Sequence, residues 1–309
     1  MKTPRRSTLL ASAVLAAGLV VAGTSTAGAA TGNGAWDPLS RCPVDAPAML
    51  AADGASTAAI CLASHATSGS MTIGRTTVPT GAVDLQIGVL RTGSTYAVVA
   101  PAKGTVVADP VSVPGGLLGI MCGDPNPLID TICRGLAGSP LNVVTATVEA
   151  AGDPSEFNLT SGLTAGKPIL KLPVKIHLRN VLLGTSCYLG SDSDPIVLQP
   201  RNTARPTATL TRFDPDGTLS STGIMGYLAI SGTDQTDTTF TVPGANGCGL
   251  LGILNGAVND KLGLPSASGS NALTLTAADT SFGGFYTPNS FAPTEGQQLS
   301  TRWHAAFRG

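Results

Sequence analysis

A regular alternation of apolar and polar side chains over residues 168–180 is the sequence feature that most constrains the fold. The apolar positions of this segment are Leu172, Val174, Ile176 and Leu178. Because successive side chains of a strand point to opposite faces, this period predicts a strand with one face in a core. Lys175, His177 and Arg179 would then form an outward row, which is either a solvated sheet face or a binding face for an anionic wall polymer or lipid.

Most of the remaining chain consists of similar short apolar runs separated by turn residues. The runs cover residues 71–78, 82–90, 96–100, 104–108, 142–150, 196–198, 208–213, 224–230, 238–242 and 271–277. Turn-forming sequences such as Asp214-Pro215-Asp216-Gly217 stand between them. Short strands with frequent Gly and Pro predict an all-β fold, mainly antiparallel and sandwich-like.

Two apolar segments, residues 115–138 and 249–264, depart from the strand pattern. Their spacing predicts two short helical insertions, the first broken at residues 124–127. Each segment follows a Val-Pro-Gly sequence, which begins at Val113 or at Val242. This echo raises the hypothesis of two related halves, about 42–155 and 156–285; a chance match between Gly- and Leu-rich segments is the alternative.

The N-terminus has the layout of a secretory signal peptide. Basic residues within the first six positions precede an uncharged apolar run, residues 9–23, and Ala27-Gly28-Ala29 offers a cleavage site. The run is shorter than the roughly 20 residues that a bilayer span needs. We therefore expect a cleaved signal peptide, residues 1–29, and a secreted protein, extracellular or loosely cell-wall associated, without a membrane span; an uncleaved anchor is the alternative.

Three further parts are expected after the signal peptide. Residues 30–41 are predicted to be a flexible lead-in, residues 42–285 a disulfide-stapled β domain, and residues 286–309 an aromatic-rich C-terminal tail. The aromatic residues near the C-terminus are Phe282, Phe285, Tyr286, Phe291, Trp303 and Phe307. Since buried aromatic rings contribute strongly to packing, we interpret them as tying the tail onto the sheet; exposed, they would form a surface for a glycan or a partner.

Six cysteines follow the predicted signal peptide: Cys42, Cys61, Cys122, Cys133, Cys187 and Cys248. An even number in an exported chain predicts three disulfides, but sequence alone does not choose the connectivity. Pairing of neighbours is the interpretation that we favour, which joins Cys42 to Cys61, Cys122 to Cys133 and Cys187 to Cys248. A metal site or a reactive thiol is disfavoured because no C-x-x-C motif occurs.

Charge and motif content exclude several function classes. Charged residues make up 12% of the chain and its net charge is −1, which is unsuited to nucleic acid. The motifs G-x-S-x-G, S-x-x-K and H-E-x-x-H do not occur. Only Glu149, Glu156 and Glu295 could supply glutamates for a glycosidase cleft. We expect no catalytic residue and no cofactor, so an enzyme is the less favoured interpretation.

Two pairs of aspartates are candidate calcium ligands. Asp192 and Asp194 form one pair, and Asp214 and Asp216 form the other. Each pair places closely spaced carboxylates in a turn, and carboxylate oxygens are the ligands that calcium prefers. Such sequences are also ordinary turns, so neither pair predicts a metal site firmly.

Five segments together carry a resemblance to known proteins. The segments are Gly116-Leu117-Leu118-Gly119-Ile120-Met121-Cys122, Ile132-Cys133, Leu141-Asn142-Val143-Val144-Thr145-Ala146-Thr147, Leu172-Pro173-Val174-Lys175-Ile176-His177-Leu178 and Leu182-Leu183-Gly184-Thr185-Ser186-Cys187-Tyr188. Over roughly residues 70–280 the chain resembles a group of secreted actinobacterial proteins of unknown function. The resemblance implies export but no activity, so it assigns no catalytic residue.

The combined prediction is an exported, non-catalytic β protein, extracellular or associated with the cell envelope, with a binding or structural role. Its partner would be a cell-wall polymer, a glycan or an envelope protein, and its oligomeric state is left open. One alternative is an extracellular hydrolase with a non-standard site, which requires His65 or His177 in a pocket near a Ser or Asp. Another is a carrier of an apolar ligand, which requires a continuous cavity lined by Leu, Ile and Val between sheet and helices.

Overall fold

The computed structural model describes residues 32–123, 126–136, 138–287 and 293–308. The predicted signal peptide, the break at residues 124–125 and Phe291 lie outside these ranges. The described chain is an all-β fold with three antiparallel sheets, a few short helices and three disulfides. The predicted fold class is therefore confirmed.

Sheet A contains seven strands in the order β13-β14-β18-β1-β4-β5, and β6 also pairs with β4. Its strands are β1 (Thr57–Ala66), β4 (Val83–Thr92), β5 (Thr95–Val99), β6 (Val106–Ala108), β13 (Thr207–Phe213), β14 (Met225–Ser231) and β18 (Asp279–Phe285). Sheet B has the order β12-β15-β17-β2-β3. Its strands are β2 (Ser68–Ile73), β3 (Thr76–Thr80), β12 (Arg201–Asn202), β15 (Gln235–Asp237) and β17 (Ala272–Thr276).

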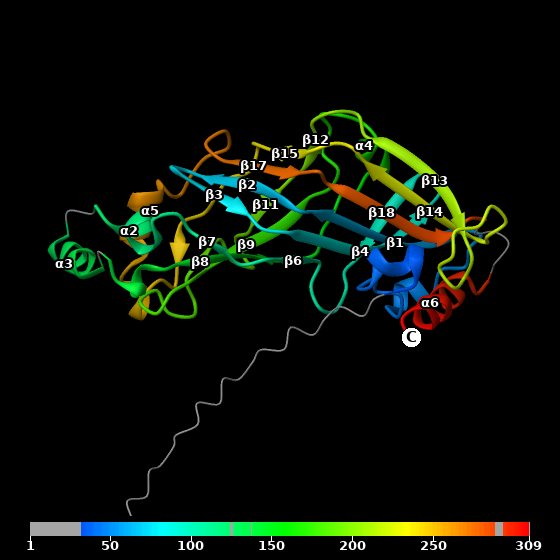
Figure 1. Cartoon of the computed structure of the whole chain (residues 1–309), viewed down its shortest axis with the longest axis horizontal. Helices are drawn as coiled ribbons and strands as arrows, with labels where there is room; N and C mark the ends of the chain where they lie inside the picture. The colour runs from blue at the N-terminus through cyan, green and yellow to red at the C-terminus, as the bar shows by residue number, and fades with distance from the viewer. Residues whose placement is uncertain (1–31, 124–125, 137, 288–292, 309) are drawn as a thin grey trace, which may run out of the picture. The chain divides into compact units, whose positions relative to one another are not determined.

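Sheets A and B are successive parts of one long layer. Five stretches of chain pass from one sheet into the other, joining β1 to β2, β3 to β4, β12 to β13, β14 to β15 and β17 to β18. Figure 1 shows these stretches as long ribbons that run side by side from sheet B to sheet A. The strand orders of the two sheets correspond for this reason.

Sheet C packs against the inner face of this layer. It has the order β16-β10-β9-β8-β7, and β11 also pairs with β9. Its strands are β7 (Val111–Ser112), β8 (Thr145–Ala150), β9 (Leu172–Arg179), β10 (Tyr188–Leu189), β11 (Ile196–Leu198) and β16 (Ala245–Asn246). Leu62, Met71 and Val174, one from each sheet, belong to the same buried cluster, which is the main core.

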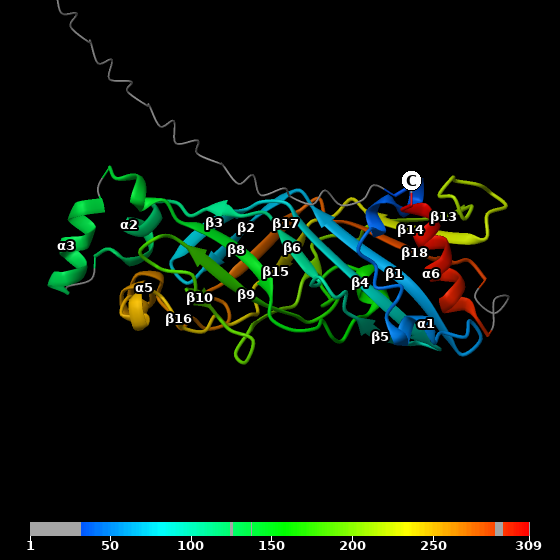
Figure 2. The ribbon, with the colours of Figure 1, turned by 90° about the horizontal axis from the view of Figure 1, so that it is seen from below.

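Helices gather at the two ends of this sandwich (Figure 2). One end carries α2 (Gly116–Met121), α3 (Pro127–Leu136), α5 (Asn255–Leu262) and the 3₁₀ turns η2 (Pro140–Asn142) and η3 (Leu250–Gly252). These elements confirm the two predicted helical insertions. The other end carries η1 (Gly34–Leu39), α1 (Pro47–Leu50) and α6 (Glu295–Ala306), while α4 (Leu159–Gly162) lies between strands β8 and β9 in the chain.

The predicted flexible lead-in is wrong over its described residues, 32–41. Trp36 and Leu39 are fully buried in a second core on the outer side of sheet A. The Trp36 ring meets Phe213 edge-on at 5.2 Å between ring centroids, and its Nε1–H donates to the carbonyl of Pro215 at 3.1 Å. Two large apolar side chains in one turn gain enough by burial to order this segment.

The aromatic tail packs onto the fold, which is the favoured one of the two predicted alternatives. Trp303 of α6 donates its Nε1–H to the carbonyl of Leu39 at 2.8 Å, and its ring lies 4.6 Å from that of Phe307. Phe282 and Phe285 are buried, whereas Tyr286 is exposed with Arg212 over its ring. The C-terminal helix is thereby tied to the N-terminal segment.

All three disulfides join the predicted neighbours: Cys42 with Cys61, Cys122 with Cys133, and Cys187 with Cys248. The first attaches the N-terminal segment to β1, and the second joins the C-terminal end of α2 to Cys133 within α3. The third crosses from the chain before β10 to the chain before η3. The pairing prediction is confirmed.

The two hypothetical halves do not form separate domains. In sheet A, β1, β4 and β5 come from the first half and β13, β14 and β18 from the second. The central pair β1–β18 joins the halves through six residue pairs. A duplication would therefore have produced intertwined halves, and the duplication itself stays a prediction.

Candidate functional site

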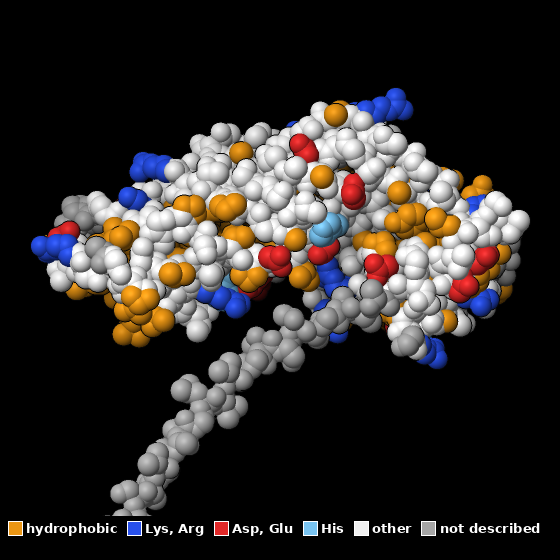
Figure 3. Space-filling model, in the orientation of Figure 1, with side chains coloured by type: hydrophobic (Ala, Val, Ile, Leu, Met, Phe, Trp, Pro, Cys, Tyr) orange, Lys and Arg blue, Asp and Glu red, His pale blue; other side chains and the backbone are white. Residues whose placement is uncertain are grey.

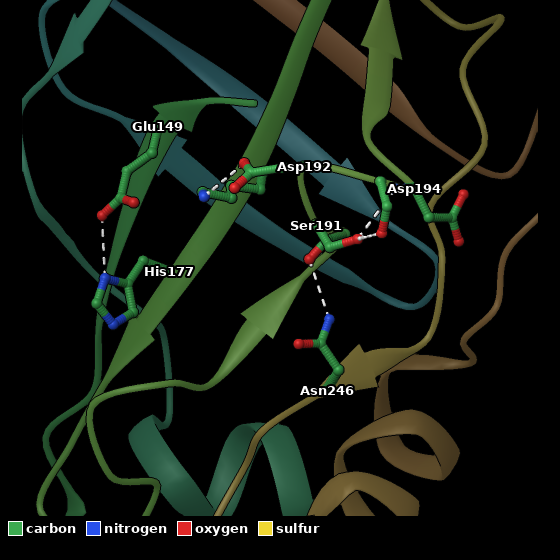
Figure 4. Close-up of polar contacts among 9 residues, drawn as sticks. Glu149, His177, Ser191, Asp192, Asp194 and Asn246 are labelled. Carbon is green, nitrogen blue, oxygen red and sulfur yellow. Dashed lines mark hydrogen bonds and ion pairs between the residues drawn. The ribbon is translucent and has the colours of Figure 1, made fainter. Parts of the chain in front are cut away.

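His177 does not lie on a solvated face, which corrects the predicted outward row. Its side chain is 8% exposed, and its ring stacks on Tyr188 at 4.3 Å between centroids. Nδ1 lies 3.0 Å from Oε1 of Glu149, and Nε2 lies 3.1 Å from the carbonyl oxygen of Thr185. Figure 4 shows Glu149 and His177 pointing toward one another from neighbouring strands. The adjacent strand β10, whose Tyr188 pairs with His177, buries the ring.

The two cationic neighbours of His177 are already paired. Lys175 Nζ lies 2.7 Å from Asp192 and 5.2 Å from the centre of the Tyr188 ring. The hydrogen bond that Lys175 donates to Asp192 raises the pKa of Lys175 above its ordinary value. Arg179 Nη2 lies 3.6 Å from Glu149. The row predicted as a binding face is therefore a cluster that ties β8, β9 and β10 together.

Both ring nitrogens of His177 have partners: Nδ1 contacts Glu149 and accepts a hydrogen bond from Nε of Arg179 at 3.2 Å, and Nε2 contacts the carbonyl of Thr185. His65 contacts Asp84, with 2.7 Å between Nδ1 and Oδ1, and about half of its side chain is exposed. In the described part of the chain, no serine, threonine or cysteine side chain hydrogen-bonds to either ring, so neither forms a nucleophile–base pair.

The aspartate pairs do not assemble calcium sites. Asp192 is engaged by Lys175, and Asp216 accepts the backbone N–H of Thr218 at 2.9 Å. That hydrogen bond lowers the pKa of Asp216, as expected for an acceptor within a turn. Among the described residues there is no group of three or more His, Cys, Asp or Glu side chains that could hold a metal ion. The predicted calcium ligands are turn residues.

A different feature stands out at the helical end of the sandwich, where aliphatic side chains face solvent. Figure 3 shows orange side chains gathered at the left, below the position of α2 in Figure 1. We define the apolar end patch as the exposed residues Leu141, Val143, Val181, Leu182, Leu250, Leu251 and Ile253. Leu251 is 95% exposed and Val181 is 81% exposed.

Three loops form the apolar end patch, and hydrogen bonds hold them together. The side-chain Nδ2 of Asn180 donates to the carbonyls of Leu141 and Val143, each at 2.7 Å. The N–H of Gly249 donates to the carbonyl of Leu183 at 2.8 Å. The disulfide between Cys187 and Cys248 fastens the second loop to the third. The exposed side chains therefore stand on a rigid base.

Leu251 adopts a backbone conformation that its side chain disfavours. Its φ is 55° and its ψ is 23°, in the left-handed region. An L-residue with a Cβ pays about 1–2 kcal/mol there. Because its side chain is almost fully exposed, the fold recovers nothing from burying it. Strained residues of this kind cluster at functional sites, which makes Leu251 a candidate functional position.

The sequence pattern does not predict the pairing of Glu149 with His177, the stacking of Tyr188 on that ring, or the apolar end patch. Residues 249–264 were predicted to be an apolar helix, which implies burial, but the helix α5 begins only at Asn255. The sequence Gly249-Leu250-Leu251-Gly252 could have distinguished the turn from the helix that follows it, because closely spaced glycines disfavour a helix and favour a turn.

Comparison with known proteins gives no relative for this chain: no family model matches, and neither a curated protein nor a solved structure shows significant similarity. The resemblance to secreted actinobacterial proteins therefore stays a prediction. Within the residues that the structure describes, no helix has the length and apolar character of a membrane span. The function has to be inferred from the residues of the chain itself.

Proposed function

We propose that this protein is an exported, non-catalytic binding protein, which holds a protein of the cell envelope through the apolar end patch. The observation that carries the proposal is Leu251, an almost fully exposed leucine on a strained backbone, within an aliphatic surface that three hydrogen-bonded loops form. Exposed apolar patches of this kind mark interaction sites in soluble proteins.

The chemistry of the patch favours a protein among the three predicted partners. It consists of Leu, Val and Ile and contains no aromatic ring on which a sugar could stack. An anionic wall polymer would need free cationic side chains, whereas Lys175 and Arg179 are paired with carboxylates. Aliphatic side chains on rigid loops suit an apolar groove of another protein.

Site-specific photo-crosslinking tests this proposal. A benzophenone side chain replaces Leu251, and the matched control replaces Leu219, which is 64% exposed in a loop outside the patch. After exposure to envelope proteins of the producing cells, we expect one discrete adduct from position 251, which Val181→Asp abolishes, and none from position 219. Equal labelling from both positions, or no protein adduct from position 251, would contradict the proposal.

The substitution Leu251→Asn separates binding from folding. Asparagine tolerates the left-handed conformation, so the free energy of unfolding should rise by about 1 kcal/mol while partner capture falls. Leu219→Asn is the control and should leave capture unchanged. Urea denaturation measures stability, and the crosslinking yield at a second patch position, Leu250, measures binding. A less stable Leu251→Asn variant that still captures the partner would refute the role given to Leu251.

A further inference from the structure

Two apolar cavities follow one another inside the sandwich. The first, with a volume of about 50 Å³, lies between sheets B and C, where Met71, Ile73 and Ile176 line it. The second, with a volume of about 80 Å³, lies between sheet A and residues 157–172. Val83 lines both cavities, so this one side chain lies between them.

The first cavity reaches the surface at the seam between two sheet edges. Strand β3 is the last strand of sheet B and β7 the last strand of sheet C, and both contribute lining residues. Pro79 and Asp109, which are exposed, stand at this seam and also line the cavity. The inner end is closed by Ile120 of α2 and Leu262 of α5. The first cavity therefore lies nearest to solvent at the seam between β3 and β7.

The size of the cavities restricts the shape of a ligand. Each is far smaller than the roughly 300–1,000 Å³ of a drug-sized pocket. Their combined volume approaches the value of about 150 Å³ for an apolar cavity that accepts a small hydrocarbon. Apolar space of this volume suits one short unbranched chain and excludes a sterol or a lipid with several chains.

The polar residues of the cavities restrict the ligand's end group. The second cavity carries four polar side chains: Ser64, Asn202, Gln235 and Thr280. No Lys or Arg is among the described residues that line either cavity. A buried carboxylate would thus lack a counter-charge, which is unfavourable, whereas a hydroxyl or ester group could hydrogen-bond to these side chains.

We propose that the two cavities form one site for a single unbranched aliphatic chain with an uncharged polar end, which enters between β3 and β7. The site is independent of the apolar end patch. It gives the protein a small-molecule ligand in addition to the proposed protein partner.

Methyl NMR with octan-1-ol as the probe tests the site directly, with octanoate as the charged counterpart. We expect saturable shifts of the methyl groups of Val83, Val148 and Ile176 on addition of octanol, and at least about tenfold weaker binding of octanoate. Shifts confined to Leu250 and Leu251, or no saturable shift up to the solubility limit of octanol, would overturn the proposal.

Substitutions separate this site from the surface. Val83→Phe fills the junction of the cavities, so octanol affinity should fall by about tenfold or more. Val107→Phe adds the same ring to an exposed position on β6 and should leave the affinity unchanged. If Val83→Phe does not fold, Val148→Leu replaces it as the test variant, because it is a smaller change to a residue that lines the first cavity. Leu251→Asn should bind octanol normally, so loss of partner capture and loss of octanol binding are distinguishable.

Discussion

At the scale of single residues, Glu295 makes the folding stability depend on pH. It is the first residue of α6 and is completely buried. Its Oε2 accepts the backbone N–H of Ala59 at 3.1 Å, but its buried Oε1 has no hydrogen-bond partner among the residues that the structure describes. Burial, with a smaller contribution from Asp53, raises the pKa of Glu295 from 4.5 to about 7. The fold therefore favours the protonated carboxyl.

The sign of this effect follows from proton linkage. Between pH 4.5 and about 7 the folded chain binds more protons than the unfolded chain, so folding stability declines as pH rises through this window. The slope is at most about 1.4 kcal/mol per pH unit. Stability from this group is fully present below pH 4.5 and is lost above pH 7.

Glu295→Gln should remove this dependence, since glutamine can accept from Ala59 without carrying a charge. We expect the variant to be more stable than the parent near pH 8, by roughly 2–3 kcal/mol, and the difference to vanish near pH 4.5. Urea denaturation of both proteins across this range measures it. A stability difference that does not change with pH would assign the effect to packing instead of ionisation.

At the scale of strands and helices, the sequence predicted those elements whose side chains alternate. Strand β9 was predicted from its alternating Leu, Val and Ile residues and pairs on both sides in sheet C. The central strands β1 and β18 were missed. Both are rich in Ala, Ser or Gly, which have low strand propensity, and they form because neighbouring strands pair on both sides. Pairing with the neighbouring strands, and not local propensity, therefore determines these two strands.

The candidate surfaces were less predictable for a related reason. The ring of His177 is buried by Tyr188, and the register that brings them together depends on a loop whose course no local pattern specifies. Likewise, the position of the apolar end patch depends on which Leu-rich segments are left uncovered by other strands and helices. Periodicity identifies apolar residues, but burial depends on the neighbours that the topology supplies.

A disulfide stabilises the fold more when it closes a longer loop, and the gain rises with the logarithm of loop length. Cys187 and Cys248 are separated by 61 residues, and Cys122 and Cys133 by 11. Replacing the first pair by alanines should lower the free energy of unfolding by about 4 kcal/mol, and replacing the second by about 3 kcal/mol. Urea denaturation without reductant measures both variants. Equal or reversed losses would show that local packing outweighs chain entropy here.

At the scale of the whole molecule, every sheet is shared between the two halves of the chain. Strand β1 pairs with β18 in sheet A, β2 pairs with β17 in sheet B, and β8 pairs with β9 in sheet C. Each ladder joins residues before 156 to residues after 155. Neither half therefore keeps an intact sheet once the other is removed.

This arrangement predicts that the halves fold only together. Residues 32–155 and 156–308, produced separately, should each show poorly dispersed amide NMR spectra and no cooperative urea transition, because each would expose the unpaired edges of three sheets. The control is the full chain with a protease site at the exposed residues Gly152 and Asp153, cleaved after folding. We expect the two pieces of this control to remain associated and to retain the native spectrum. A dispersed spectrum from either isolated half would show that it possesses an independent core, and the intertwined sheets would then be an association of two domains.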